Sequence, residues 1–284
     1  MNSLMRYSTE GRGMDFNGKA VEGVVSVQPI VRFDSSGGFR STMDDCVREH
    51  PLLVQLDGVP IVRVVLSPYR LEEFVVGFLV NEGFIEGPGD IRSIEVSGGT
   101  ASVFCSPSRS LVAPGNETAV LESTGATRLE PRPKTLKKPG ALRPGPLVTS
   151  EVVFRCMKSL DKMPIHRRTG GTHCAVLFTA EGEEVFGCED IGRHNAVDKT
   201  VGGAIRAGAE LKHSWLAVAG RLAADMVRKP AASGIPLIAS LAAATYDGVE
   251  LGRRSGLTVI GHCKKGSFNC YCHPERIKDY RPVA

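Results

Sequence analysis

Long apolar segments are missing from this sequence of 284 residues. It contains no run of about 18 apolar residues, and the N-terminal stretch MNSLMRYSTEGRGMDF lacks the apolar core of a signal peptide, so neither membrane insertion nor secretion is predicted. Neither sign of charge is in large excess. The formal net charge is only +4, which is too small to predict a nucleic-acid partner. The eight cysteines do not follow the spacing of a disulfide framework, and we therefore expect a cytoplasmic protein.

The composition, 42% hydrophobic and 23% charged, is ordinary for a soluble globular protein, and the length allows about two domains. Residues 128–146 interrupt the pattern, since they hold five prolines and six basic residues against the single acid Glu130. We interpret them as a solvated linker, and the alternative is a basic flap over an anionic ligand. The predicted order is a loose tail (1–20), a small α+β domain (21–127), a Pro-rich basic linker (128–148) and an α/β domain (149–284).

The first half shows the signals of a hairpin followed by a helix. Residues 53–65 are predicted to form two strands that turn at Asp57-Gly58, and Pro60 places the second strand at a sheet edge. Ser67 is the expected N-cap of the next helix, and Gly83 suits its end.

The second half alternates strands and helices. A hairpin is predicted at residues 174–188, and three further strands are predicted at 215–219, 236–240 and 257–263, each preceded by a helix. This alternation predicts a mostly parallel, three-layer α/β sheet. In such sheets ligands bind beyond the carboxyl ends of the strands and at helix N-termini.

Polar residues gather at both ends of the predicted 174–188 hairpin. Any one of them is more simply explained as a turn residue or a solvated helix charge, but the whole set in so short a span indicates a site. The set comprises His173, Glu189, Asp190, Arg193, His194, Asn195, Asp198 and Lys199.

These residues also carry a family resemblance. TGGTHCA (169–175) and EDIGRHNAVDKTVG (189–202) are similar to the signature blocks of the FdhD/NarQ family of formate dehydrogenase accessory proteins. Gly220-Arg221 and the tail GHCKKGSFNCYCHPERI (261–277) extend the match, which covers roughly residues 45–280.

The resemblance implies a cytidine deaminase-like fold and a role in sulfur transfer. Members receive sulfur from a cysteine desulfurase as a persulfide on a CxxC loop and pass it to the molybdenum cofactor, which then enters formate dehydrogenase. The implied ligand is molybdopterin guanine dinucleotide or a GDP-like molecule. We also expect a homodimer.

The persulfide loop is where this sequence departs from the family. The matching residues, 122–128, read ESTGATR, so both cysteine positions are threonines, Thr124 and Thr127. A threonine hydroxyl cannot form a persulfide, and enzymatic sulfur transfer is left open. The alternatives are an escort of the cofactor without sulfur transfer and a non-catalytic guanine-nucleotide-binding regulator.

The predicted cofactor contacts combine cations, glycines that let backbone approach phosphate, and hydrogen-bonding side chains. They are Gly170, Gly171, His173, Asp190, Arg193, His194, Asn195, Lys199, Gly220, Arg221, His262, Cys263, Lys264, Lys265, Gly266 and Ser267. Asp190 or Glu189 is the expected acceptor for guanine N–H groups.

No metal is predicted. The helix starts at His194 and Gly220 lack the glutamate and the cysteines of a zinc deaminase, so deamination is rejected. Cys270 and Cys272, at i and i+2 of a strand, are expected to face one side and to be half-buried. Cys46 is expected to be a small core residue.

Overall fold

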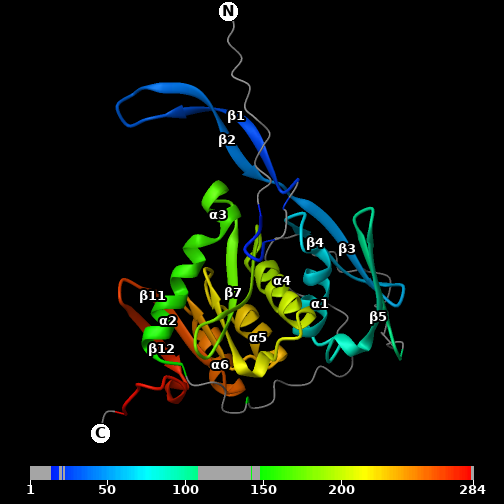
Figure 1. Cartoon of the computed structure of the whole chain (residues 1–284), viewed down its shortest axis with the longest axis vertical. Helices are drawn as coiled ribbons and strands as arrows, with labels where there is room; N and C mark the ends of the chain where they lie inside the picture. The colour runs from blue at the N-terminus through cyan, green and yellow to red at the C-terminus, as the bar shows by residue number, and fades with distance from the viewer. Residues whose placement is uncertain (1–13, 19–20, 22, 108–141, 143–147, 283–284) are drawn as a thin grey trace, which may run out of the picture.

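The computed structural model describes residues 14–18, 21, 23–107, 142 and 148–282, which form three β-sheets with associated helices (Figure 1). Thr124, Thr127 and nearly all of the predicted linker lie outside these residues. Within the described part of the chain, no helix combines the length and apolar character needed to cross a membrane.

The largest sheet has six strands in the order β12-β11-β10-β9-β7-β8. The strands are β7 (His173–Thr179), β8 (Glu184–Asp190), β9 (Ser214–Val218), β10 (Leu237–Ser240), β11 (Thr258–Lys264) and β12 (Ser267–Cys272). The predicted 174–188 hairpin is confirmed as β7 and β8. The prediction of a mostly parallel sheet is wrong, because only the β9-β10 and β10-β11 pairings are parallel. The β7-β8 and β11-β12 hairpins lie at the two ends of the sheet, and β7 also pairs antiparallel with β9.

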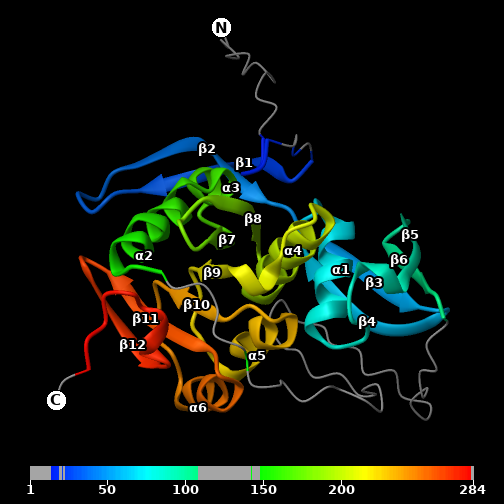
Figure 2. The same ribbon diagram turned by 60° about the horizontal axis from the view of Figure 1, so that its bottom comes forward.

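Helices cover both faces of this sheet, as Figure 2 shows. The alternation of β7 makes this possible: Cys174, Val176 and Phe178 join one core cluster, whereas Ala175 and Leu177 join the other. On the first face lies α2 (Ser150–Met157), and on the second lie α4 (Arg193–Arg206), α5 (Ala224–Ser233) and α6 (Tyr246–Ser255). The short helix α3 (Pro164–Thr169) leads into β7.

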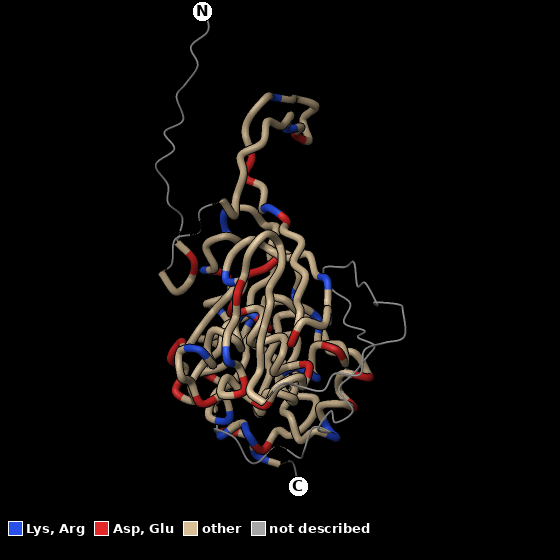
Figure 3. The backbone as a smooth tube through the Cα atoms, turned by 90° about the vertical axis from the view of Figure 1, so that its right-hand side faces the viewer, with Lys and Arg blue, Asp and Glu red and all other residues tan. Residues whose placement is uncertain are grey.

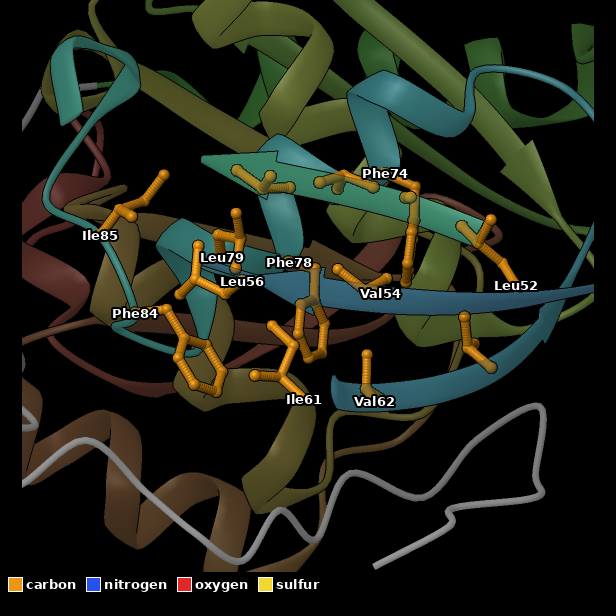
Figure 4. Packing of buried hydrophobic residues seen from close by; sticks show 14 of the residues in the cluster. Leu52, Val54, Leu56, Ile61, Val62, Phe74, Phe78, Leu79, Phe84 and Ile85 are labelled. Carbon is orange, nitrogen blue, oxygen red and sulfur yellow. The ribbon is translucent and has the colours of Figure 1, made fainter. Parts of the chain in front are cut away.

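The second sheet has four strands, in the order β4-β3-β6-β5, and packs on α1 (Leu71–Asn81). Its strands are β3 (His50–Leu56), β4 (Val59–Leu66), β5 (Ile91–Ser97) and β6 (Thr100–Cys105). The predicted turn is confirmed, since Asp57 and Gly58 have φ values of 49° and 82°, and Pro60 lies on the edge strand β4. Figure 4 shows the core between this sheet and α1, where the Phe74 and Phe78 rings stack with centroids 5.7 Å apart.

Helices α1 and α4 join the two sheets through an unusually close contact. A Cβ atom on Gly77 would lie 1.8 Å from the Asp198 carbonyl oxygen, and one on Gly202 would lie 1.8 Å from that of Glu73. Only glycine at both positions permits this separation of the helix backbones. Helix α4 carries much of the predicted site, and its position is therefore determined by its contact with α1, the helix that packs on the four-stranded sheet.

The predicted cap of α1 is wrong. Its N-cap is Arg70, which has φ 53° and accepts no side-chain capping bond, while Ser67 lies three residues earlier. The Ser67 hydroxyl instead accepts the backbone N–H of Ile191 (3.2 Å), and its own N–H donates to Asp190 Oδ2 (2.9 Å). Ser67 is therefore used to join the two sheets and is not available to start a helix.

A two-stranded ribbon that the sequence did not predict stands away from the body, as Figure 3 shows. It consists of β1 (Val25–Phe33) and β2 (Phe39–Val47). At its base, Asp45 pairs with Arg168 of α3 at 2.8 Å, and a Cβ atom on Gly171 would lie 2.9 Å from Val47 Cγ1. The ribbon is thus attached to α3 and to the segment that enters β7.

Candidate functional site

The carboxyl ends of the parallel strands and the start of β7 meet at one edge of the large sheet. His173 is paired with Asp190 across the β7-β8 hairpin, which puts the start of α4 beside it. The loop after β9 is held by a bond from Ser240 Oγ to the Gly220 carbonyl oxygen (2.6 Å), and the His262 N–H donates to Ala242 O (2.9 Å). The structure therefore brings three of the predicted segments, around residues 173, 190–195 and 220–221, to one edge.

The central element of this edge is a pair formed by His194 and Asp225. His194 is 3% exposed, and its Nε2 lies 2.8 Å from Asp225 Oδ2. The contact with His194, supported by the charge of Arg193, lowers the pKa of the Asp225 carboxyl group to about 2. Asp225 is missing from the sequence prediction, because an acid in the first turn of a helix is most simply explained by the helix dipole.

Three buried nitrogen atoms at this edge are without a hydrogen-bond partner among the described residues. They are Arg193 Nε and both ring nitrogens of His194, whose contact with Asp225 is an ion-pair distance only. A buried polar group without a partner costs about 1–3 kcal/mol, so native structures rarely retain one without a reason. These three atoms mark the place where a ligand with acceptor oxygens would be stabilised.

Arg193 is positioned by a glycine. A Cβ atom on Gly220 would lie 3.1 Å from Arg193 Cδ, so the absence of a side chain lets the arginine pass close to the loop backbone. Arg221, the next residue, is exposed. His173 is also exposed, yet partial burial and the nearby charge of Arg193 lower the pKa of its imidazole. The accessible groups are therefore cations and hydrogen-bond donors, which suit an anion.

Asp190, Asn195 and Lys199 make contacts different from those predicted. Lys199 Nζ lies 2.6 Å from Asp190 Oδ2 and 2.9 Å from Ser67 O, and both charged side chains are fully buried. Asn195 Nδ2 donates to Asp190 Oδ1 (2.9 Å) and to Val65 O (3.0 Å). All these partners are inside the protein, so the three side chains connect the large sheet to the smaller one and do not face a ligand.

Glu189 and the two glycines of the TGGTHCA block support α3. Burial raises the pKa of Glu189 to about 7, and its carboxylate accepts the backbone N–H groups of Ile165 (3.1 Å) and His166 (2.8 Å). Gly170 ends α3 with φ 65°, and Gly171 makes room for Val47 of the ribbon. Their conformations are explained by turn and packing requirements.

The residues predicted in the 262–267 segment differ in their exposure to solvent. Lys264, Lys265, Gly266 and Ser267 are exposed at the β11-β12 turn, and His262 is exposed with φ 53°. Cys263 is 2% exposed and belongs to the core cluster beside α2, where burial raises the pKa of its thiol to about 11. Its side chain therefore faces the core and not the exposed β11-β12 turn.

The expected common orientation of Cys270 and Cys272 is wrong. The register shifts between Val259↔Cys272 and Ile260↔Cys270, so Tyr271 forms a β-bulge. Cys270 packs against one core cluster and Cys272 belongs to the opposite one. No group of three or more His, Cys, Asp or Glu side chains in the described ranges is arranged to hold a metal ion.

Cys46 also differs from the prediction. All eight cysteines lie in the described part of the chain; six are buried, Cys270 is partly buried, and Cys46 alone is exposed. It lies on the ribbon strand β2, opposite Ser26, where no core covers it.

The fold and the site together define a mixed α/β protein with several sheets and a cationic strand edge. The sequence model of the FdhD/NarQ family matches residues 47–278, and the chain belongs to this family. A sulfur carrier protein FdhD from Methanothermobacter thermautotrophicus is 33% identical over 84% of this chain and 93% of its own length. The Bordetella bronchiseptica protein of the same name is 30% identical over 82% of this chain and 87% of its own.

A solved structure supports the same conclusion about the architecture. A formate dehydrogenase accessory protein from Desulfotalea psychrophila superposes with a TM-score of 0.71 and 27% sequence identity. The match covers 89% of this chain and 99% of that chain, so it extends over nearly the whole fold.

Proposed function

We propose that this protein is a cytoplasmic accessory factor of formate dehydrogenase that binds the molybdenum cofactor as cargo, in its guanine dinucleotide form. The names of the relatives, sulfur carrier protein and formate dehydrogenase accessory protein, support this role. The proposal includes a cytidine deaminase-like three-layer domain for the large sheet, formate dehydrogenase as the receiving partner and a cysteine desulfurase as the family's sulfur donor.

The observation that carries the proposal is the set of unsatisfied and cationic groups at one strand edge. Arg193 Nε and both ring nitrogens of His194 are buried without a hydrogen-bond partner in the described part of the chain, and His173 and Arg221 are exposed on the same segments. A pyrophosphate offers acceptor oxygens and negative charge to such groups. Recognition of guanine by Asp190 or Glu189 has less support, since both carboxylates are engaged inside the protein.

We expect GDP to bind to the purified protein and the Arg193→Ala variant to bind it more weakly. Loss of one charge-assisted hydrogen bond should cost about 1.5–3 kcal/mol, which is about 10- to 160-fold in Kd. Isothermal titration calorimetry measures the difference. Arg254→Ala, at an exposed position in the last turn of α6, is the matched control and should leave Kd unchanged. Absence of GDP binding in the unaltered protein would exclude the site.

The ribbon supports a homodimer as part of the same proposal. Alternate residues of β1 and β2 give it an apolar face, on which Val27, Val31, Phe33 and Phe39 are each more than half exposed. A two-stranded sheet with an uncovered apolar face is marginally stable in water, and an apolar face can pair with itself about a two-fold axis. We therefore assign a second copy of the chain to this face.

We expect Val31→Asp to convert the dimer to a monomer, because two carboxylates would be buried in an apolar interface. Light scattering coupled to size-exclusion chromatography gives the mass. Gln28→Asp, on the opposite face of the same strand, is the control and should leave the mass unchanged. A monomer for the unaltered protein at micromolar concentration would contradict this assignment.

A further inference from the structure

We propose that Tyr246 stacks on the flat base of a nucleotide whose phosphates bind at the strand edge, so that the site prefers a diphosphate that carries an aromatic ring to a bare diphosphate. This inference rests on the proposed function, because it extends the same strand edge. It adds a specificity residue that neither the family match nor the names of the relatives contain.

Tyr246, the first residue of α6, is the most exposed large apolar side chain among the described residues. It is 79% exposed, compared with 42% for Tyr280. In the described part of the chain, its hydroxyl group has no hydrogen-bond partner and its ring packs on no other ring. The helix does not need it as a cap either, since Thr245 is the N-cap and accepts the N–H of Gly248 (3.2 Å). Neither packing nor capping therefore explains an aromatic side chain at this position.

The first turn of α6 packs directly on the loop that follows β9. A Cβ atom on Gly248 would lie 2.3 Å from the Leu222 carbonyl oxygen, so only glycine permits this approach. The Leu222 N–H donates to Ala243 O, and the Thr245 N–H donates to Leu222 O, each at 3.0 Å. These contacts hold the start of α6, and with it Tyr246, beside the loop backbone.

The groups of the anion site lie at the other end of the same loop. A Cβ atom on Gly220 would lie 3.1 Å from Arg193 Cδ, and the exposed Arg221 follows Gly220. Arg193 Nε and the ring nitrogens of the buried His194 have no hydrogen-bond partner among the described residues, which independently indicates a ligand there. Loop residues 220–222 thus connect the anion site to Tyr246.

The opposite direction along the strand edge is closed to a base. At the end of β8, Asp190 Oδ2 accepts the Ser67 N–H (2.9 Å), and the Tyr69 hydroxyl group donates to Glu189 O (2.6 Å). All four residues are buried, so the segment that precedes α1 covers this end of the edge. A base attached to phosphates at the anion site therefore extends toward β10 and α6, where Tyr246 is exposed.

An exposed aromatic ring distinguishes ligands by their shape. Bases stack on aromatic side chains through their flat faces, and this contact needs no hydrogen bond to a particular base edge. A bare diphosphate has no such face and gains nothing from the ring. The ligand class that fits both parts of the edge is a diphosphate linked to a purine or pterin ring.

The test is calorimetry with GDP and with inorganic pyrophosphate. Tyr246→Ala should raise the Kd of GDP about 5- to 150-fold, the range expected for one base on one aromatic ring, and should leave the Kd of pyrophosphate unchanged. Tyr246→Phe keeps the ring and should bind both ligands like the unaltered protein. Arg193→Ala should weaken both ligands. Tyr280→Ala, at the partly exposed tyrosine near the C-terminus, is the matched control and should change neither Kd.

Fluorescence of a Tyr246→Trp protein reports the stacking directly. The single native tryptophan, Trp215, is fully buried against Phe178 with ring centroids 5.0 Å apart, so its emission should stay constant. GDP should quench the emission of the introduced indole, and pyrophosphate should not.

The outcomes separate this inference from the proposed function. If Tyr246→Ala weakens GDP and pyrophosphate equally, the substitution acts on the loop and the inference is overturned. GDP binding that weakens in Arg193→Ala but not in Tyr246→Ala refutes only this inference. If the unaltered protein binds no GDP, the proposed function fails and this inference fails with it.

Discussion

An Asp190→Ala protein is expected to lose about 3–5 kcal/mol of its free energy of unfolding, because the substitution leaves a buried charge without its partner. The ammonium group of Lys199 is completely buried, and among the described residues its counter-ion is Asp190, at 2.6 Å. The same carboxylate accepts the backbone N–H groups of Ser67 and Gly192, at 2.9 Å each. Urea unfolding followed by circular dichroism measures the loss.

The double variant Asp190→Leu/Lys199→Met keeps the prediction testable if the single variant does not fold. Removal of both charges should recover part of the loss, since an apolar pair of similar volume avoids desolvation of a charge. Glu72→Ala is the surface control: its pair with Arg206 is about half exposed, and the expected cost is below about 1 kcal/mol. An Asp190→Ala loss as small as that of the control would show that Lys199 finds water or another partner.

Restoration of the two missing thiols is expected to produce the largest change in activity. In a strain that lacks its own sulfur carrier of this family, the natural protein should not support formate dehydrogenase activity, whereas Thr124→Cys/Thr127→Cys should. The reason is chemical: a persulfide requires a thiolate, and hydroxyl oxygens cannot carry transferable sulfur. Formate oxidation in cell extracts is the measurement, and Thr124→Ser/Thr127→Ser is the matched control.

The positions of the native cysteines sharpen this experiment. Burial raises the pKa values of the Cys174, Cys188, Cys263 and Cys270 thiols, which makes them poor persulfide carriers. Cys46 is the exposed one, so any label left by a cysteine desulfurase on the natural protein should disappear in Cys46→Ser. Full formate dehydrogenase activity with the natural protein would refute the loss of sulfur transfer and direct attention to Cys46.

Local chemistry was sufficient to predict the hairpins. Asp57-Gly58 adopts the positive φ angles that such a pair favours, and the 174–188 hairpin follows from its two apolar runs around a polar turn. The ribbon β1-β2 escaped prediction, because its alternation of apolar and polar residues is weak, and most of its apolar side chains stay exposed, with only Val25 and Val47 packed against a core cluster. Cys270 and Cys272 were placed on one side because a bulge at Tyr271 leaves no mark in the spacing.

The sequence also predicted the strand edge as the place of the site, but it predicted only some of the residues that lie there. Arg193, His194, Gly220 and Arg221 do meet there, as expected from the ends of strands. Asp225 was missed, since its role depends on His194 approaching from another helix.

The sequence by itself determined the family, the alternation of strands and helices, and the absence of thiols at Thr124 and Thr127, because these depend only on residue type and spacing along the chain. Only the tertiary structure decided which polar residues face one another. By residue type and position in the sequence, Asp190 and Lys199 cannot be told from ligand-binding residues. In the structure they bond to Ser67, which is more than 120 residues away, and this contact buries them. Burial and partner geometry arise from contacts between distant segments, and no local pattern encodes them.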